Sequence, residues 1–322
     1  MALAAQTRWA LVGPGAIGLY YGGLLIQHGV HLSVLARSDA AALSAAGIRL
    51  RMMQTEAIAA ETPQLKTEVC ARPNLITTEP KDIGPVDCVL IAAKSTVNPQ
   101  LLSSLRPLVQ PAHTSLLTLQ NGMGNAEFLA QHFPENPILA GLCFVCVNRT
   151  APGVVENFLP GRVEIGSLQD RWPQLVGDVV GTFNAAGISA TASAQLDAAL
   201  WRKLCWNIPF NGLSIAGGGL TTDRILKDPA LRAQARRLME EVRRVAAHAG
   251  YSISDAFIQG QFDVTDRMGA YQPSSLIDYL QGKPIEIESI WGEPLRRGQT
   301  MGLELPELER LYHAIQAMPA RA

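Results

Sequence analysis

The sequence predicts an α/β protein whose first domain is built on a doubly wound parallel sheet and whose second domain is all helical. Short apolar runs alternate with helical patterns through the first half of the chain, which is typical of βαβ units. A glycine-rich turn joins the first apolar run to the first helical pattern. Beyond residue 193 the apolar runs give way to amphipathic helical patterns. We therefore expect a sheet domain over residues 1–193 and a helical domain over residues 194–322.

The expected strands are short runs that are apolar almost throughout, as parallel strands covered on both faces must be. They are Trp9–Val12, Val30–Ala36, Asp87–Ala93, Thr114–Leu119 and Ile138–Val147. Helical segments separate them, beginning with residues 17–28. Between residues 141 and 168, glycines separate short extended pieces, so we expect hairpins that close the domain.

The helical domain is predicted from spacing and from helix ends. Residues 228–250 form a long amphipathic pattern that ends at a glycine, a common helix terminator. In residues 197–211, leucine and isoleucine recur every four positions and share one face. Further helices are expected over residues 273–281, 286–301 and 306–318.

The composition argues against several functional classes. Hydrophobic residues make up 48% of the 322 positions, enough to bury the cores of two domains. The 27 lysines and arginines balance 28 aspartates and glutamates, so no basic excess favours nucleic acid as a partner. Five scattered cysteines do not suggest a disulfide framework and favour a cytoplasmic location. Residues 9–36 lack charge, but one proline and six glycines interrupt them, so we expect no membrane segment.

The glycine-rich turn has the spacing of a dinucleotide-binding motif. Its residues are Gly13, Pro14, Gly15, Ala16, Ile17 and Gly18. In such motifs the first glycine makes the turn, the second lets the backbone approach a pyrophosphate, and the third lets helix and strand pack closely. An ordinary strand-to-helix turn is the alternative. The position of the motif between an expected strand and an expected helix favours a Rossmann-type cofactor site.

Two basic residues follow expected strands at the same edge of the sheet. Arg37 stands where an enzyme that uses NAD usually has an acidic residue, and an arginine there favours the 2′-phosphate of NADP. Asp39 lies close by in sequence, and an exposed loop charge is the alternative for Arg37. Lys94 directly follows residues 87–93 and is expected either to hold the cofactor or to be exposed.

Polar residues also cluster in two other places. Asn121 lies in a Gln-Asn-Gly-Met-Gly turn after an expected strand, on the edge of the sheet that faces ligands. Lys203, Asn207 and Asn211 are four residues apart and lie on one helical face among apolar neighbours. A turn signal is the alternative for Asn121, and a surface stripe is the alternative for the helical residues.

Taken together, these motifs resemble the ketopantoate reductase (2-dehydropantoate 2-reductase) family over nearly the whole chain. The resemblance covers the glycine motif, the arginine after the second strand, the IAAK and QNGMG segments, and the helix that begins WRKL. It also covers SSLIDYLQGKPIEIE at residues 274–288, whose spacing matches the family's Ser-x-x-x-Asp and Gly-Arg-Pro-Thr-Glu-Ile-Asp pattern. Six motifs in the same order are more specific than any one of them.

The resemblance implies a role for each matching residue. Lys203 corresponds to the general acid, and Glu286 to an essential glutamate at the cofactor and the active-site lysine. Asn121 corresponds to an asparagine near both cofactor and substrate. Substrate contacts are implied for Asn207, Asn211 and Ser274. The implied enzyme is an NADP-dependent oxidoreductase that reduces ketopantoate to pantoate, a step of pantothenate biosynthesis, in a cleft between the domains.

Two departures from the family pattern keep alternatives open. Residues 217–222 read GGGLTT where the family has a Pro-Asn-Gly segment, and Trp291 replaces an asparagine. A reductase of another 2-oxo acid or of an imine is one alternative, and a non-catalytic protein that senses NADPH is another. The histidines show no ligand spacing, so we predict no metal. A homodimer is kept as a candidate assembly.

Overall fold

The computed structural model describes residues 7–54 and 63–319. Contacts divide these residues into two compact units. The first unit contains the described residues up to Leu196, except for the segment Asn121–Gly124. That segment belongs to the second unit, together with the described residues from Asp197 onward.

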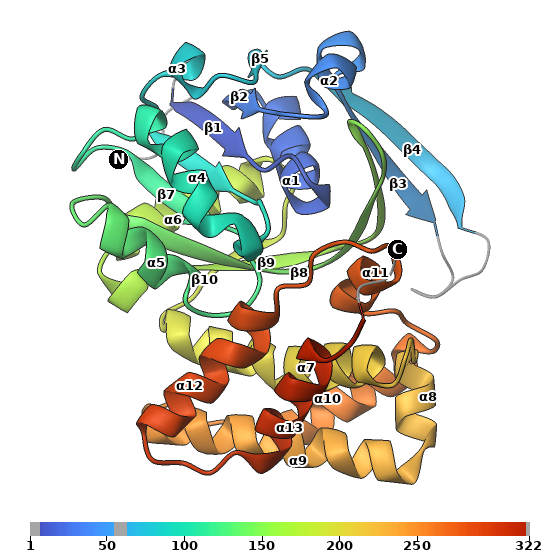
Figure 1. Ribbon diagram of the computed structural model, residues 1–322. Coiled ribbons are helices and arrows are strands. Elements are labelled where there is room, and N and C mark those ends of the chain that lie inside the picture. The colour runs from blue at the N-terminus through green and yellow to red at the C-terminus, as the bar shows by residue number, and fades with distance from the viewer. Residues whose placement is uncertain (1–6, 55–62, 320–322) are drawn as a thin grey trace. The chain divides into compact units, whose positions relative to one another are not determined.

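The first unit is built on one ten-stranded sheet, shown in Figure 1. Its strands, in spatial order, are β4 (Gln64–Ala71), β3 (Ile48–Gln54), β9 (Val154–Ser167), β8 (Ile138–Ala151), β7 (Ser115–Thr118), β6 (Cys88–Ile91), β1 (Arg8–Val12), β2 (His31–Leu35) and β5 (Leu75–Thr77). A short strand, β10 (Ala190–Ala192), pairs with β9. The α/β class predicted from the sequence is confirmed.

Two of the strand pairs are antiparallel, so the sheet is mixed rather than fully parallel. These pairs are β3 with β4 and β8 with β9. Only the two residues 152 and 153 separate β8 from β9, and a connection this short cannot cross over to make a parallel pair. The hairpin that the glycines between residues 141 and 168 predict is therefore present as β8 and β9.

Helices cover the sheet of the first unit. They are α1 (Ala16–Gln27), α2 (Ala40–Ala46), α3 (Pro80–Ile83), α4 (Asn98–Leu105), α5 (Asn125–His132) and α6 (Pro173–Ala185). The ring of Phe183 on α6 packs against those of Trp9 on β1 and Tyr21 on α1, with centroid distances of 6.4 and 5.9 Å. All three side chains are almost completely buried. The face of β1 that carries Trp9 is therefore closed by α1 and α6.

The described residues of the second unit form helices and turns without any strand. The helices are α7 (Leu196–Ala216), α8 (Thr222–Lys227), α9 (Pro229–His248), α10 (Asp255–Met268), α11 (Ser274–Leu280), α12 (Glu293–Thr300) and α13 (Pro306–Gln316). A π-helical turn, η4 (Glu288–Gly292), directly precedes α12. The core gathers around fully buried aromatic side chains, those of Trp201, Phe210, Phe262 and Trp291. Across the described part of the chain, no helix is long and apolar enough to cross a membrane.

Candidate functional site

The glycine-rich turn follows β1 and leads into α1, as the motif requires. Gly13 has a φ of 92°, and a Cβ atom there would lie 2.1 Å from the backbone nitrogen of Ala93. A Cβ atom on Gly18 would lie 2.4 Å from the carbonyl oxygen of Gly13. Both positions therefore exclude any side chain. Gly13 is required by the geometry of the turn, and Gly18 by the close packing of the helix on the turn.

Gly15 differs from its two neighbours in the motif. Its φ is −81°, and a Cβ atom there would lie 4.0 Å from the nearest atom outside the turn, the carbonyl oxygen of Ala92. Neither backbone strain nor crowding inside the protein explains a glycine at this position. The close approach of a pyrophosphate, which the motif assigns to the second glycine, explains it.

The amino terminus of α1 is suited to bind an anion. Its N-cap is Gly15, no side chain caps it, and its first turn contains no acidic residue. The N–H groups of the first turn point out of the helix, and the helix dipole adds positive potential at this end. A phosphate placed there would satisfy both features.

The turn after β1 lies at the point where the strand order of the sheet reverses. β1 pairs with β2 on one side and with β6 on the other, and ligands bind at such switch points in α/β sheets. Because a Cβ atom on Gly13 would lie 2.1 Å from the backbone nitrogen of Ala93, the turn after β1 and the segment after β6 lie side by side. Lys94, half-buried, is therefore next to the glycine turn, as its place after β6 predicts.

Arg37 and Asp39 have different surroundings although they are two residues apart. Arg37 is exposed after β2. Asp39 is 2% exposed, and Arg149 pairs with its carboxylate at 2.9 Å, while the Ser38 hydroxyl donates to it at 3.0 Å. Because Asp39 is buried and paired with Arg149, Arg37 is the charged side chain that the chain presents after β2.

Lys203 and Asn121, which lie 82 positions apart in the sequence, are brought together. The Nζ atom of Lys203 on α7 donates to Oδ1 of Asn121 at 3.0 Å, and both side chains are half-buried. Asn121 belongs to the second unit although its turn follows β7 of the sheet. The ammonium of Lys203 is thus held at a defined point rather than left to sample solvent.

Asn207 and Asn211 follow Lys203 along α7 but are buried to different degrees. Asn207 is half-buried, whereas Asn211 is 1% exposed. Oδ1 of Asn211 accepts from the backbone N–H of Ser275 at 2.9 Å. Pro273 precedes α11 and provides no side-chain cap, so Asn211 caps the helix from α7. The oxygen of Asn211 is therefore committed to α11, which leaves its amide nitrogen for any ligand.

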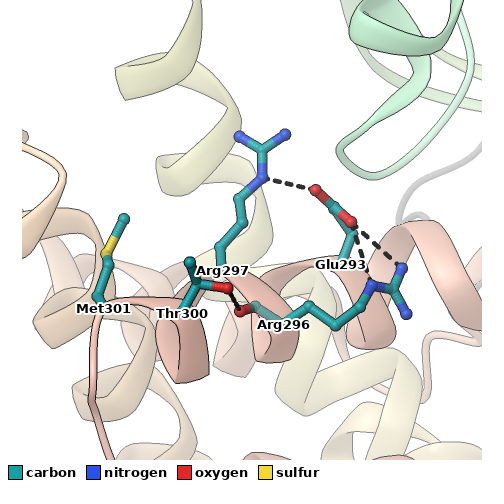
Figure 2. A pocket seen from close by; sticks show the side chains of 5 residues that line it. All are labelled: Glu293, Arg296, Arg297, Thr300 and Met301. Atoms are coloured by element: carbon teal, nitrogen blue, oxygen red, sulfur yellow. Dashed lines mark hydrogen bonds and ion pairs between the residues drawn. The ribbon is translucent and has the colours of Figure 1, made fainter.

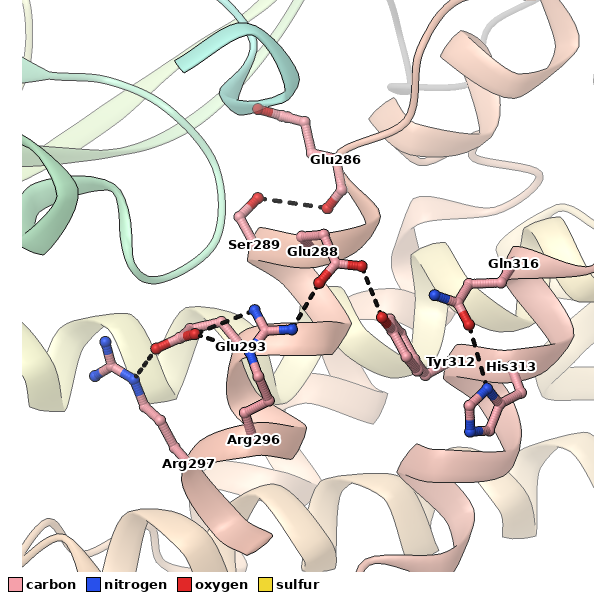
Figure 3. Close-up of polar contacts among 9 residues, drawn as sticks. All are labelled: Glu286, Glu288, Ser289, Glu293, Arg296, Arg297, Tyr312, His313 and Gln316. Atoms are coloured by element: carbon pink, nitrogen blue, oxygen red, sulfur yellow. Dashed lines mark hydrogen bonds and ion pairs between the residues drawn. The ribbon is translucent and has the colours of Figure 1, made fainter. Parts of the chain in front are cut away.

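Ser274 begins α11, and Glu286 lies in the loop that follows this helix. Ser274 is exposed at the first turn of α11, where Asn211 secures the backbone. Glu286 is 8% exposed. Figure 3 shows its side chain extending away from the ionic cluster formed by Glu288, Arg296 and Tyr312. Glu286 and Glu288 are two residues apart in the sequence, but their side chains point into different surroundings.

The ionic cluster was not predicted from the sequence. Glu288 accepts hydrogen bonds from Arg296 at 2.6 Å and from the Tyr312 hydroxyl at 2.7 Å. Desolvation acts to raise the pKa of Glu288, but the bonds from Tyr312 and Arg296 outweigh it and hold the pKa below its ordinary value. Glu293 binds both Arg296 and Arg297, as Figure 2 shows for the pocket that these residues line. Because both arginines are paired with carboxylates, this pocket is a poor site for an anionic substrate.

The two departures from the family pattern differ in burial: Trp291 is packed inside the second unit, whereas residues 217–222 run from exposed Gly217 and Gly218 to buried Thr222. Trp291 is fully buried, and its indole N–H donates to the carbonyl of Ile208 at 3.0 Å. Thr222 is also fully buried, and its hydroxyl donates to the carbonyl of Gly269 at 2.9 Å. Both side chains support the helical framework and expose no atoms to a substrate. In the described residues, no group of three or more His, Cys, Asp or Glu side chains is arranged to hold a metal.

Comparisons with known proteins agree on one family. The family model described as ketopantoate reductase PanE/ApbA matches residues 9–170, and the model of its C-terminal part matches residues 195–319. A 2-dehydropantoate 2-reductase of Nostoc sp. is 33% identical over 98% of this chain and 96% of its own length.

Solved structures give the same result. The crystal structure of 2-dehydropantoate 2-reductase from Geobacter metallireducens GS-15 aligns with a TM-score of 0.87 and 34% identity, covering 96% of this chain and 99% of that one. The ternary structure of D-mandelate dehydrogenase with NADH and anilino(oxo)acetate aligns with a TM-score of 0.84 at 22% identity, covering 96% of this chain and 97% of that one. At that identity the likeness shows a shared fold.

Proposed function

The chain belongs to the ketopantoate reductase family, an oxidoreductase family, and we propose that it reduces ketopantoate (2-dehydropantoate) to pantoate with NADPH, a step of pantothenate biosynthesis. The observation that carries this proposal is the bond from Lys203 Nζ to Asn121 Oδ1. It unites the two polar motifs that the sequence places far apart. It also holds an ammonium in the way that a general acid requires.

The proposed cofactor site is the turn Gly13–Gly18 with Arg37 and Lys94. The uncapped start of α1 and the unexplained glycine at position 15 support binding of a pyrophosphate there. The exposed guanidinium of Arg37, with Asp39 buried against Arg149, supports NADPH over NADH because it can pair with the 2′-phosphate. NADPH supplies the hydride when it is bound.

Lys203 is proposed to serve the developing charge of the reaction. When a hydride reaches the 2-oxo carbon, the carbonyl oxygen becomes an alkoxide that needs a proton and a positive field. An ammonium provides both. Asn121 accepts one of its three N–H groups, which restricts the direction in which the remaining two can point. Glu286, buried to 8% exposure, is proposed to act with Lys203 and the cofactor, as the family match implies.

The substrate is proposed to be held by Ser274, Asn207, Asn121 and the amide nitrogen of Asn211. Ser274 offers an exposed hydroxyl at the first turn of α11. A hydroxyl and amide donors suit the carboxylate of a 2-oxo acid. Fixing the carboxylate end orients the carbonyl so that one face is presented for reduction.

A second candidate is reduction of a different 2-oxo acid on the same scaffold. The D-mandelate dehydrogenase neighbour, with its anilino(oxo)acetate ligand, supports this alternative because it has the same fold and a bulky aromatic ligand. A non-catalytic NADPH sensor is the third candidate. The joint presence of Lys203 and Glu286 favours catalysis over sensing.

The proposal is tested by NADPH oxidation with ketopantoate, with a panel of aliphatic and aromatic 2-oxo acids, and with NADH in place of NADPH. We expect the highest kcat/KM for ketopantoate with NADPH. A higher value for another acid would favour the second candidate. Tight binding of NADPH without turnover of any acid would favour the sensor.

Location and assembly complete the proposal. No disulfide joins any of the five cysteines, all of which lie in the described residues, and this supports a reducing cytoplasm as the compartment. A homodimer is the proposed assembly, and sedimentation equilibrium of the full chain, with and without NADPH, tests it. A monomer mass across micromolar concentrations would contradict the dimer.

A further inference from the structure

The π-helical turn η4 has an unusual hydrogen-bond register. The N–H of Glu293 donates to the carbonyl of Glu288, five residues earlier. In the same register the donor for the Ser289 carbonyl would be residue 294, which is proline and has no N–H. The Ser289 carbonyl accepts instead from the backbone N–H of Met123, at 2.8 Å.

The segment that supplies this donor is the turn Asn121–Gly124, which docks on η4 backbone against backbone. Gly122 has a φ of 84°, and a Cβ atom there would lie 2.2 Å from the Ser289 oxygen. Gly124 has nearly the same φ, 85°, but its Cβ atom would meet only the Glu293 side chain, at 3.4 Å. Position 122 thus requires glycine for contact as well as for conformation, whereas position 124 requires it for conformation alone.

The docked turn places the partner of the proposed general acid. Asn121 directly precedes Gly122, and its Oδ1 accepts from Lys203 Nζ at 3.0 Å. The bond from Met123 to Ser289 holds the backbone two residues further on. Any change that lifts the turn from η4 would move Asn121 relative to Lys203.

We propose that Gly122 is a positioning residue, which lets the turn Asn121–Gly124 dock on the Ser289 carbonyl and so holds Asn121 against the ammonium of Lys203. This inference rests on the proposed function, because it takes Lys203 to be the acid. π-Helical turns are frequent at functional sites, and here the turn presents a backbone carbonyl sideways to a segment that is distant in the sequence. A purely structural role is the rival explanation, in which the docking stabilises the fold and leaves the chemistry untouched.

The matched variants are Gly122→Ala and Gly124→Ala in the full chain, because both force alanine into the same backbone region. For each we would measure kcat and KM with NADPH and ketopantoate, NADPH affinity by fluorescence, and Tm. Displacement of a catalytic group by a fraction of an ångström to one ångström costs up to about 100-fold in rate. We therefore expect kcat to fall about 10- to 100-fold in Gly122→Ala and less than about threefold in Gly124→Ala, with NADPH affinity retained in both. Equal losses in the two variants would overturn the inference.

A double-mutant cycle separates positioning from a general loss of stability. If Gly122 acts through Asn121, Gly122→Ala should lower kcat by less than about threefold in an Asn121→Ala background, because residues that act as a unit are non-additive. The full loss in that background would overturn the inference. The activity of the unaltered chain is the reference, so a failure of the proposed function is seen there before any variant is compared.

A measurement on the unaltered chain covers the case in which Gly122→Ala does not fold. Hydrogen exchange should show the Met123 amide protected by about 100-fold or more over its rate in an unstructured peptide, because it is bonded inside a folded unit. The protection should persist in Gly124→Ala. An unprotected Met123 amide in the unaltered chain would overturn the docking, whatever the outcome of the activity assays.

Discussion

Two glycine turns of this protein look alike in sequence and serve different purposes. The turn Gly13–Gly18 follows β1, and the turn Asn121–Gly124 follows β7. Each contains a glycine with positive φ whose Cβ atom would strike backbone, at Ala93 in the first case and at Ser289 in the second. The first turn stays within the sheet unit and opens an uncapped helix, whereas the second packs within the helical unit.

The difference shows that a strand followed by a glycine turn does not define a function by itself. What lies opposite the turn decides its role. Opposite the first turn is another strand end, so the helix terminus and the close backbone remain available to an anion. Opposite the turn Asn121–Gly124 lies the Ser289 carbonyl of η4. That turn therefore binds η4 and positions Asn121 beside Lys203.

The largest effect is expected from Lys203→Ala. Loss of a positioned acid should lower kcat by about 10²- to 10⁴-fold, the usual scale for general acid catalysis. NADPH affinity should change by less than about threefold, because the proposed phosphate site lies in the first unit. Steady-state kinetics and fluorescence titration on the same sample check both values. A kcat close to that of the unaltered chain would remove Lys203 from the chemistry.

The first turn can be broken in two distinct ways. Gly13→Ala should reduce the free energy of unfolding by about 3–5 kcal/mol, because it combines strained φ with a backbone clash. Gly15→Ala should leave that free energy within about 0.5 kcal/mol of the original value, because its Cβ atom meets no close neighbour. Gly15→Ala should nevertheless lower the affinity for NADPH, since the added methyl group would lie where the pyrophosphate approaches. Unchanged NADPH affinity in Gly15→Ala would mean that the turn is structural only.

Ser274→Ala should raise the KM for ketopantoate and leave NADPH affinity unchanged. A lost hydrogen bond to a charged group costs about 1.5–3 kcal/mol, which corresponds to about 10- to 150-fold in KM. Steady-state kinetics with saturating NADPH measure this value. An unchanged KM would exclude Ser274 from the substrate site.

Asn211 is expected to affect substrate binding partly through α11, because its oxygen accepts a hydrogen bond from the Ser275 N–H. Asn211→Ala should lower the free energy of unfolding by about 0.5–2 kcal/mol, as loss of a helix cap does. It should also raise the KM for ketopantoate by about threefold to tenfold, less than Ser274→Ala does. In a Ser274→Ala background the effect of Asn211→Ala on KM should shrink, since part of it acts through Ser274. Full additivity in that cycle would mean that Asn211 meets the substrate independently of Ser274.

An effect confined to one of the two cofactors is expected from Arg37→Ala. The guanidinium is exposed, so its contact with a 2′-phosphate should be worth about 1–1.5 kcal/mol, close to tenfold in NADPH affinity. NADH affinity should not change, because NADH lacks that phosphate. Titration of both cofactors checks this, and equal losses would show that Arg37 is structural.

Much of the fold could be predicted because local patterns determine it. The apolar strands, the glycine motif and the amphipathic helix α9 are encoded in short stretches of sequence. The β3–β4 hairpin was missed, because β4 is polar and largely exposed and ion pairs of Glu68 with Arg49 and Arg51 join the two strands. No apolar run marks such an edge strand. Helix α10 was also missed, because only three of its fourteen residues are buried and its apolar face is narrow.

The site was predictable to the level of residue identity but not of contact. Spacing placed Lys203, Asn207 and Asn211 on one face of α7, and the position after an expected strand marked Asn121. Neither could reveal that Asn211 bonds to a backbone 64 positions away, or that Trp291 is buried against α7 rather than exposed to a ligand. Those contacts depend on how the helices pack, which no short stretch of sequence encodes.

The most direct test of the division between the two regions is the rate of a single turnover at saturating NADPH, measured by stopped-flow on Gly15→Ala and Lys203→Ala. If the first turn only binds the cofactor, saturation should restore Gly15→Ala to within about threefold of the unaltered chain, because lost affinity is overcome by concentration. If Lys203 is the acid, its variant should stay about 10²- to 10⁴-fold slow at any NADPH concentration. A Lys203→Ala enzyme that regains its rate when NADPH is saturating would show that Lys203 is not the acid.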